Sequence, residues 1–301
     1  MPIEFIFFIE VLAGGLLAGV MYALVALGFV LIYKASGVFN FAQGAMVFFA
    51  ALTFVSLVER GWNMWLALVV TLAVMVLLGL ATERVVLRPL VNQPPITLFM
   101  ATIGLTFVLE GLSQLIWGSQ PHGLELGIPD VPMEALSQKW NINISQFDVF
   151  AAVVAGLLVA VLAVFFHKTR IGRALRAVAD DHQAALAVGI PLQHIWAIVW
   201  AVAGFVALVA GLMWGVRNGV QFALTFVALK ALPVLILGGF ESIAGAIVGG
   251  LIIGATEKLA EVYIGPFFGG GIESWFAYVV ALLFLLVRPE GLFGEKIIDR
   301  V

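Results

Sequence analysis

The chain has 301 residues, of which 63% are hydrophobic and only 11% are charged, and it contains no cysteine. A soluble protein could not bury this much apolar surface, so most of the chain must be solvated by lipid, and disulfide and thiolate chemistry are excluded. The net charge of −3 is too small to indicate binding to nucleic acid.

Apolar runs follow one another along the chain, separated by short polar segments. They cover residues 7–33, 41–58, 64–82, 96–117, 147–166, 194–214, 222–238, 243–260 and 274–287. Several are shorter than the ~20 residues that a straight helix needs to cross ~30 Å of hydrocarbon, so we expect eight or nine spanning segments. The uncertain run is 41–58, which opens on Asn40 and Gln43 and has the pattern of a broken or re-entrant helix. The predicted fold is an all-α, polytopic helical bundle, with residues 1–301 forming a single transmembrane domain.

The distribution of lysine and arginine indicates the orientation in the membrane, because cytoplasmic loops are enriched in both. If the polar loop 167–193 is cytoplasmic, most basic residues fall inside: Lys34, Arg84, Arg88, Lys168, Arg170, Arg173, Arg176, Arg288, Lys296 and Arg300. Only Arg60, Lys139 and Arg217 then fall outside, and the loop 118–146 lies on the outer face. Nine spans would place the N-terminus outside, whereas eight would place it inside.

Glycines spaced four residues apart within the apolar runs predict close helix packing, because small residues one turn apart let helices approach in lipid. The pairs are Gly15 with Gly19, Gly245 with Gly249, and Gly250 with Gly254. The segment 237–254 is predicted to form a tight helical hairpin. The two arms of the longer hairpin 226–258 place Lys230 and Glu257 at heights that differ by roughly 9 Å at ~1.5 Å per residue, so we do not expect the two charges to pair directly.

Several catalytic signatures are missing from the sequence. There is no phosphate-binding loop, no H-E-x-x-H motif, no nucleophile elbow and no histidine cluster. We therefore expect no enzyme activity, no metal site and no cofactor in this chain.

The stretch "RIGRALRAVADDHQAALAVGIP" (170–191) is the longest polar passage. Its apolar and charged residues alternate with helical periodicity up to Val188, and Pro191 ends any helix before the next run. A simple connector needs neither this length nor this pattern. We therefore expect an amphipathic element that lies on the membrane or docks in a groove of a partner protein, and the segment "DDHQAALAVGI" favours the protein groove.

These residues carry a family resemblance. "QAALAVG" (183–189) resembles the E-A-A-x-x-x-G motif that importers of the ATP-binding cassette (ABC) class present to their ATPase, with Gln183 in place of the usual glutamate. The chain as a whole resembles the branched-chain amino acid type of permease, the LivH-like inner-membrane subunit of amino acid importers. The matching segments are collinear: "GVMYALVALGFVLIYKASGVFNFAQGAM" (19–46), "ERVVLRPL" (83–90), "ATIGLTFVLEG" (101–111), 169–190, "LGGFESIAGAIVGGLIIG" (237–254) and "RPEGLFG" (288–294).

The resemblance implies a type II ABC importer in a bacterial inner membrane. Its expected partners are a second related permease, two ATPase subunits that bind the ATP, a periplasmic binding protein and the lipid bilayer. The loop 167–193 would be the coupling loop, and its expected ATPase contacts are Arg173, Arg176, Asp180, Asp181, Gln183, Ala184, Ala185 and Gly189. The outer loop would receive the binding protein, with Glu125, Asp130 and Glu134 as its acidic residues.

The substrate pathway is predicted to be lined by Asn40, Gln43, Thr102 and Gly104, from two segments that match the family well. The same polar groups are equally compatible with bonds between neighbouring helices. The cargo implied by the resemblance is a branched-chain or related small neutral amino acid, and urea, short amides or aromatic acids are alternatives. A stand-alone secondary transporter is the rival class, and it would contain paired ionisable residues deep in its spans. A scaffold without transport activity would leave the coupling loop unexplained.

Overall fold

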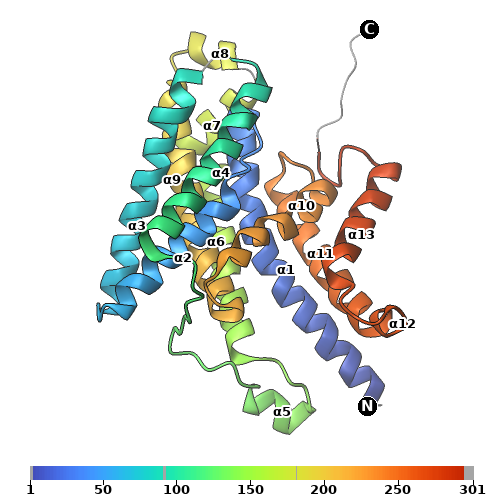
Figure 1. The fold of residues 1–301 in the computed structure, drawn as a ribbon. Coiled ribbons are helices and arrows are strands. Elements are labelled where there is room, and N and C mark those ends of the chain that lie inside the picture. The colour runs from blue at the N-terminus through green and yellow to red at the C-terminus, as the bar shows by residue number, and fades with distance from the viewer. Residues whose placement is uncertain (1–2, 91–92, 181, 295–301) are drawn as a thin grey trace. The chain divides into compact units, whose positions relative to one another are not determined.

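The computed structural model describes residues 3–90, 93–180 and 182–294, and helices dominate these residues (Figure 1). The α-helices are α1 (Ile3–Ser36), α2 (Gln43–Glu59), α3 (Met64–Ala81), α4 (Pro95–Trp117), α5 (Glu134–Trp140), α6 (Gln146–Lys168), α7 (Arg170–Asp180), α8 (His182–Ala187), α9 (Leu192–Asn218), α10 (Val227–Gly238), α11 (Ile243–Tyr263), α12 (Gly265–Phe268) and α13 (Glu273–Val287). A π-helix, η1 (Thr82–Leu87), and two 3-10 helices, η2 (Arg88–Leu90) and η3 (Phe222–Phe226), complete the elements. Within the described residues the only strand-like pairings are isolated bridges, His122 with Val220 and Pro132 with Ser145.

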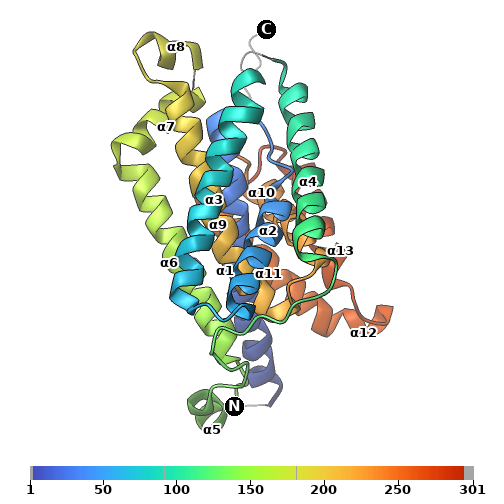
Figure 2. The same ribbon diagram turned by 60° about the vertical axis from the view of Figure 1, so that its left-hand side comes forward.

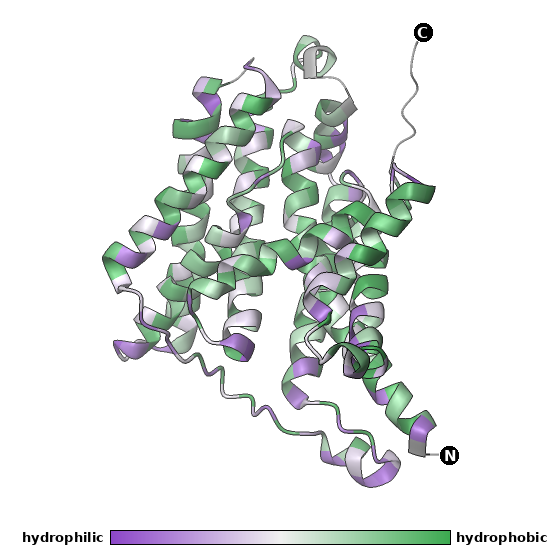
Figure 3. Ribbon diagram, turned by 45° about the vertical axis from the view of Figure 1, so that its right-hand side comes forward, coloured by the Kyte–Doolittle hydropathy of each residue, from purple (hydrophilic) through white to green (hydrophobic). Residues whose placement is uncertain are grey.

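The helices account for every apolar run of the sequence. Among the described residues, six helical segments are long and apolar enough to cross a membrane: α1, α3 continued through η1 and η2, α4, α6, α9 and α11. Three shorter apolar helices are α2, the η3–α10 segment (Phe222–Gly238) and α13. Apolar residues cover most of these helices, and polar residues gather at helix ends and in the connections (Figure 3). The predicted all-α, polytopic fold is confirmed.

The expectation of a broken helix within 41–58 was wrong in its position. α2 is one uninterrupted helix of 17 residues, and the break lies before it, at residues 37–42. Gly37 ends α1 with a φ of +67°, a conformation that costs glycine little. The Asn40 side chain then accepts a hydrogen bond from the Ala42 N–H at 3.1 Å, which satisfies a backbone donor at the new helix start.

The Cα positions divide the chain into two compact units, each assembled from separate stretches of sequence. The first unit comprises Met1–Leu27, Leu126–Ala160 and Leu229–Val301, and the second comprises Gly28–Glu125 and Val161–Ala228. Neither unit is one continuous stretch of chain, because its parts are interleaved along the sequence. That residues 1–301 act as one transmembrane domain stays a prediction.

The second unit is built around α2, which is buried along most of its length and contacts α3, α4, α9 and η3. α3 and α9 lie side by side in both ribbon views (Figures 1 and 2). Their close approach depends on glycine: a methyl group built on Gly79 would lie 2.6 Å from the Trp200 carbonyl oxygen, and one on Gly204 would lie 2.7 Å from that of Met75.

The first unit contains the predicted hairpin, with α10 ending at Gly238 and α11 beginning at Ile243. Ser242 caps α11 by accepting a hydrogen bond from the Gly245 N–H at 2.9 Å, and the backbones of Gly238 and Gly245 touch. Gly15 packs against Gly254, and Gly19 against Gly250, so the four-residue glycine spacing does mark helix contacts.

Candidate functional site

Three of the four residues predicted to line a substrate pathway meet in the second unit. Asn40, Gln43 and Thr102, the amide cluster, are each at most 1% exposed. Asn40 donates a hydrogen bond from Nδ2 to the Gln43 Oε1 atom at 3.2 Å. Thr102 Oγ1, on α4, accepts from the Phe41 N–H at 3.1 Å, and its single hydrogen is shared between the carbonyl oxygens of Phe99 at 2.8 Å and Phe39 at 3.3 Å. The threonine thereby satisfies backbone groups that the break between α1 and α2 leaves without helical partners.

One donor of this cluster has no partner. The buried Nε2 atom of Gln43 makes no hydrogen bond, and a methyl group built on Gly28 would lie 2.7 Å from it. A buried amide without a partner typically costs ~1–3 kcal/mol, so this group is available to a polar atom that reaches it. Gly28 provides the room in which this amide sits.

Gly104, the fourth predicted residue, does not join the amide cluster. It lies on an exposed face of α4, and a methyl group built on it would meet no atom within 4 Å. Residues two apart on a helix do not face each other, which explains why Thr102 and Gly104 diverge. A role of Gly104 in the pathway remains a prediction.

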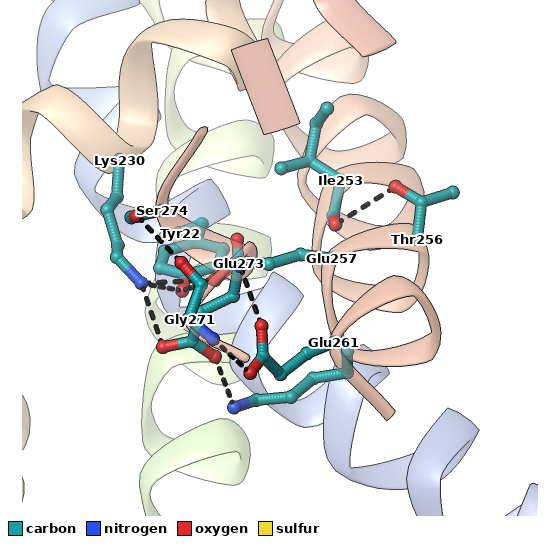
Figure 4. Close-up of polar contacts among 10 residues, drawn as sticks. Tyr22, Lys230, Ile253, Thr256, Glu257, Glu261, Gly271, Glu273 and Ser274 are labelled. Carbon is teal, nitrogen blue, oxygen red and sulfur yellow. Dashed lines mark hydrogen bonds and ion pairs between the residues drawn. The ribbon is translucent and has the colours of Figure 1, made fainter. Parts of the chain in front are cut away.

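A second polar group, the charged cluster, lies in the first unit and comprises Tyr22, Lys230, Glu257, Lys258, Glu261 and Glu273 (Figure 4). The Glu257 carboxylate accepts hydrogen bonds from the Tyr22 hydroxyl and the Lys230 ammonium, both at 3.0 Å. Lys230 Nζ also lies 3.6 Å from Glu273 Oε1, and Lys258 Nζ lies 2.8 Å from Glu273 Oε2. Glu261 accepts the backbone N–H groups of Gly271 and Glu273.

The expectation that Lys230 and Glu257 do not pair was therefore wrong. That expectation assumed two straight helices with the same rise per residue. It left out the length of the lysine side chain, whose four methylene groups place its ammonium far from the backbone. It also left out α1 and α13, which supply Tyr22 and Glu273. Pairing offsets the cost of placing an ionised carboxylate where it is only 2% exposed.

The backbone beside Lys230 contains a further polar contact. Pro233 lies inside α10 and has no N–H, so it cannot donate the helical hydrogen bond that the Leu229 carbonyl oxygen would otherwise accept. The Tyr278 hydroxyl, on α13, donates to this oxygen at 2.6 Å. α13 therefore satisfies the carbonyl that the proline leaves open.

The segment predicted to couple to an ATPase is helical on both sides of residue 181, as α7 and α8, where its periodicity predicted one helical element. α7 buries Leu175 and Val178, whereas Leu186 and Val188 near the end of α8 are exposed. Arg173 and Arg176 bond to carbonyl oxygens at the end of α6, with Arg176 Nη1 at 2.6 Å from that of Phe166. These contacts stabilise the α6 C-terminus, where positive charge is favourable.

Among the other residues expected to contact an ATPase, Ala185 is buried, whereas Ala184 and Gly189 are exposed. Gly189 has a φ of +85° and terminates the segment. Asp181 lies outside the described residues, as do the side chains of Asp180 and Gln183.

The predicted outer loop contains the short helix α5, and the three acidic residues Glu125, Asp130 and Glu134 are exposed. The Ser145 hydroxyl donates to Asp130, next to the Pro132–Ser145 bridge. In the second unit, His122 Nδ1 lies 2.9 Å from Glu59 Oε1, and its backbone pairs with that of Val220. Specific polar contacts thus fix the conformation of parts of this loop.

Sequence reasoning missed Tyr22, Glu273 and Tyr278 as members of these sites. Two signals were present: ionisable residues in or beside apolar runs, which need partners in lipid, and a proline within a helix, which leaves a carbonyl oxygen free. Neither signal identifies the partner, because the partners lie on other helices far along the chain.

Comparison with known proteins identifies relatives of this chain. The chain is similar to the high-affinity branched-chain amino acid transport system permease protein LivH of Escherichia coli (strain K12), with 28% identity over 310 residues and 99% of each chain covered. It is 29% identical over 309 residues to the corresponding permease protein BraD of Pseudomonas aeruginosa, again with 99% of each chain covered. Among solved structures, PsaBC from Streptococcus pneumoniae has a TM-score of 0.46 at 12% identity, covering 91% of this chain and 89% of that one.

A family model described as the permease component of branched-chain amino acid transport systems matches residues 11–288. This match takes in the helices of the amide cluster and those of the charged cluster. The chain therefore belongs to the family of branched-chain amino acid transport system permease components.

Proposed function

We propose that this chain is the permease subunit of a binding-protein-dependent ABC importer that carries branched-chain or related small neutral amino acids. The family and the names of the relatives support this cargo. The chain would lie in a bacterial inner membrane, beside a second related permease and above two ATPase subunits that bind and hydrolyse the ATP. A periplasmic binding protein would deliver the cargo, and the exposed acidic loop 118–146 would receive it.

The observation that carries this proposal is the amphipathic α7–α8 segment. Its buried residues Leu175 and Val178 anchor it to the chain, while Leu186 is 54% exposed and Val188 is 76% exposed. Apolar side chains at the end of a charged loop favour a groove on a partner protein over open water. In this mechanism the loop 167–193 transmits ATPase closure to the spans, which change the side on which the pathway is open.

The amide cluster supports a substrate pathway that is lined by uncharged groups. Asn40, Gln43 and Thr102 supply neutral donors and acceptors, and the unpartnered Gln43 Nε2 atom supplies a free donor. Gly104 would line a separate part of the same substrate pathway, where the free space beside it lets a ligand approach the backbone. Affinity would belong mainly to the binding protein, so a few neutral groups suffice.

The experiment is purification followed by uptake. The tagged permease should co-purify with an ATPase that contains a phosphate-binding loop, and Gly189→Trp should reduce ATPase recovery and amino acid uptake together. Because Gly189 has a positive φ, the control is Gly189→Asn, since asparagine tolerates this conformation and adds little bulk. Val188→Asp tests the exposed apolar side chain without backbone strain. Full uptake and ATPase recovery in Gly189→Trp and Val188→Asp would refute docking at this segment.

A stand-alone secondary transporter is the second candidate, and one observation favours it. The ion pair between Lys230 and the buried Glu257 is the kind of feature that such a transporter uses for ion coupling. Purification without any ATPase, together with uptake driven by an ion gradient, would support this rival. Urea, short amides and aromatic acids remain alternative cargoes within the importer class, and a ligand screen of the binding protein discriminates among them.

A further inference from the structure

The charged cluster lies within the span of α11. Glu257 precedes the end of α11 at Tyr263 by six residues, which is ~9 Å along a helix axis. Lys258 lies one residue further on, and its ammonium bonds to Glu273. Both residues thus lie in the last two turns of α11.

The cluster has a closed side and an open side. The Glu257 side chain is 2% exposed, whereas Lys230, Glu273 and Lys258 are 31%, 31% and 32% exposed. Figure 4 shows the side chains of Lys230, Glu257 and Glu273 converging, while Thr256 points away from them on α11. The open side is therefore formed by charged groups from α10, α11 and the start of α13.

Hydrocarbon covers ionised side chains only at a cost. This cost is ~2.5–3.5 kcal/mol at the centre of a span on insertion scales, and it is smaller toward the ends of a span, where Glu257 and Lys258 lie. A protein surface would have to bring positive charge, because two lysines and three glutamates give the cluster a formal net charge of −1. Water solvates the exposed charges without the cost of placing charge in lipid and without a positively charged partner surface.

We propose that the open side of the charged cluster faces a water-filled passage and contacts the charged head group of a zwitterionic α-amino acid. This inference rests on the proposed function, because it takes the cargo to be an amino acid.

The chemistry of the open side matches such a head group. An ammonium has three N–H donors, and Glu273 takes one of those of Lys258. The contact between Lys230 Nζ and Glu273 Oε1, at 3.6 Å, is longer than the other two ion pairs of the cluster, at 3.0 and 2.8 Å. A ligand carboxylate would accept from the lysines while the ligand ammonium donates to Glu273 Oε1. Each charge then keeps an opposite partner, so the exchange leaves no charge unpaired.

The absence of cysteine allows a direct test in the whole transporter, reconstituted in liposomes. Lys258→Cys introduces a thiol on the open side, and Thr256→Cys introduces a control thiol at nearly the same depth on the other side of α11. A charged, membrane-impermeant thiol reagent should modify Lys258→Cys about tenfold faster than Thr256→Cys, since lipid excludes a charged reagent. L-leucine should slow the modification of a second thiol, Ser274→Cys, whereas 4-methylpentanoate, which lacks the ammonium group, should not.

Equal modification of the two cysteines would overturn the water-filled passage. Fast modification of Ser274→Cys that saturating L-leucine leaves unchanged would overturn the head-group contact. Ser274→Cys keeps every charge of the cluster, because the Ser274 hydroxyl bonds to the Gly271 carbonyl oxygen, and it also replaces Lys258→Cys in the accessibility test should that variant not assemble. Leucine uptake and ATPase recovery, measured on the same preparation, show separately whether the proposed function holds.

Discussion

The amide cluster and the charged cluster both lie beside helical backbone that lacks a hydrogen bond, but they differ in charge and in exposure. At the break between α1 and α2, neutral side chains satisfy the free backbone groups, and the whole cluster is buried. Around the proline-containing α10, ionised side chains from three helices pair with one another, and one side stays open. The free backbone groups have neutral partners in both places, because the Tyr278 hydroxyl donates to the Leu229 carbonyl oxygen. The contrast shows that the charge of the neighbouring side chains decides whether a site must also contact water.

Removing one charge should separate the two clusters most clearly. In Lys230→Met, the buried Glu257 carboxylate keeps only the Tyr22 hydroxyl, so we expect the free energy of unfolding to fall by ~3–5 kcal/mol. Thermal unfolding of the purified protein in detergent measures this loss as a lower midpoint.

The double variant Lys230→Met with Glu257→Gln is the control. It removes both charges, so the midpoint should return most of the way to that of the parent protein. A double variant as unstable as Lys230→Met alone would mean that lost packing, and not an unpaired charge, causes the effect.

The same contrast explains what the sequence could predict. The helices, the hairpin of 237–254 and the amphipathic α7 follow from periodicity and glycine spacing, which are local properties. The contact between Asn40 and Gln43 was also local, since three residues separate them. The Lys230–Glu257–Glu273 contacts depend on how α10, α11 and α13 pack, which no local pattern encodes. Gly104 is the opposite case, because helical geometry alone places it away from Thr102.

At the amide cluster, Thr102→Val should have an intermediate effect. Valine keeps the shape of threonine but cannot accept a hydrogen bond from the Phe41 N–H, which leaves a part-buried backbone donor without this partner. We expect a loss of ~1–3 kcal/mol in the free energy of unfolding, measured by the same thermal assay.

Thr106→Val provides the matched control one turn along α4. Its hydroxyl only donates to the Thr102 carbonyl oxygen at 3.0 Å, within the same helix, so its loss leaves no backbone N–H unpaired. Equal costs for the two substitutions would show that Thr102 does not support the break between α1 and α2.

The smallest expected effect concerns the proline in α10. Tyr278→Phe removes only the hydroxyl that donates to the Leu229 carbonyl oxygen, and hydrogen bonds between membrane helices are typically worth ~0.6 kcal/mol. Tyr263→Phe is the control for the loss of a hydroxyl, since the Tyr263 ring packs on Phe7 and Phe8. Thermal unfolding should show a small drop in midpoint for Tyr278→Phe.

A double-mutant cycle decides whether the proline is the reason for this bond. Pro233→Ala restores a backbone N–H that can donate to the Leu229 carbonyl oxygen, so Tyr278→Phe should cost less in the Pro233→Ala background than in the parent. The coupling energy of this cycle then arises because both donors compete for the same Leu229 carbonyl oxygen. An identical cost in both backgrounds would mean that the Tyr278 hydroxyl stabilises α13 without compensating for Pro233, and the parallel with Thr102 at the other break would fail.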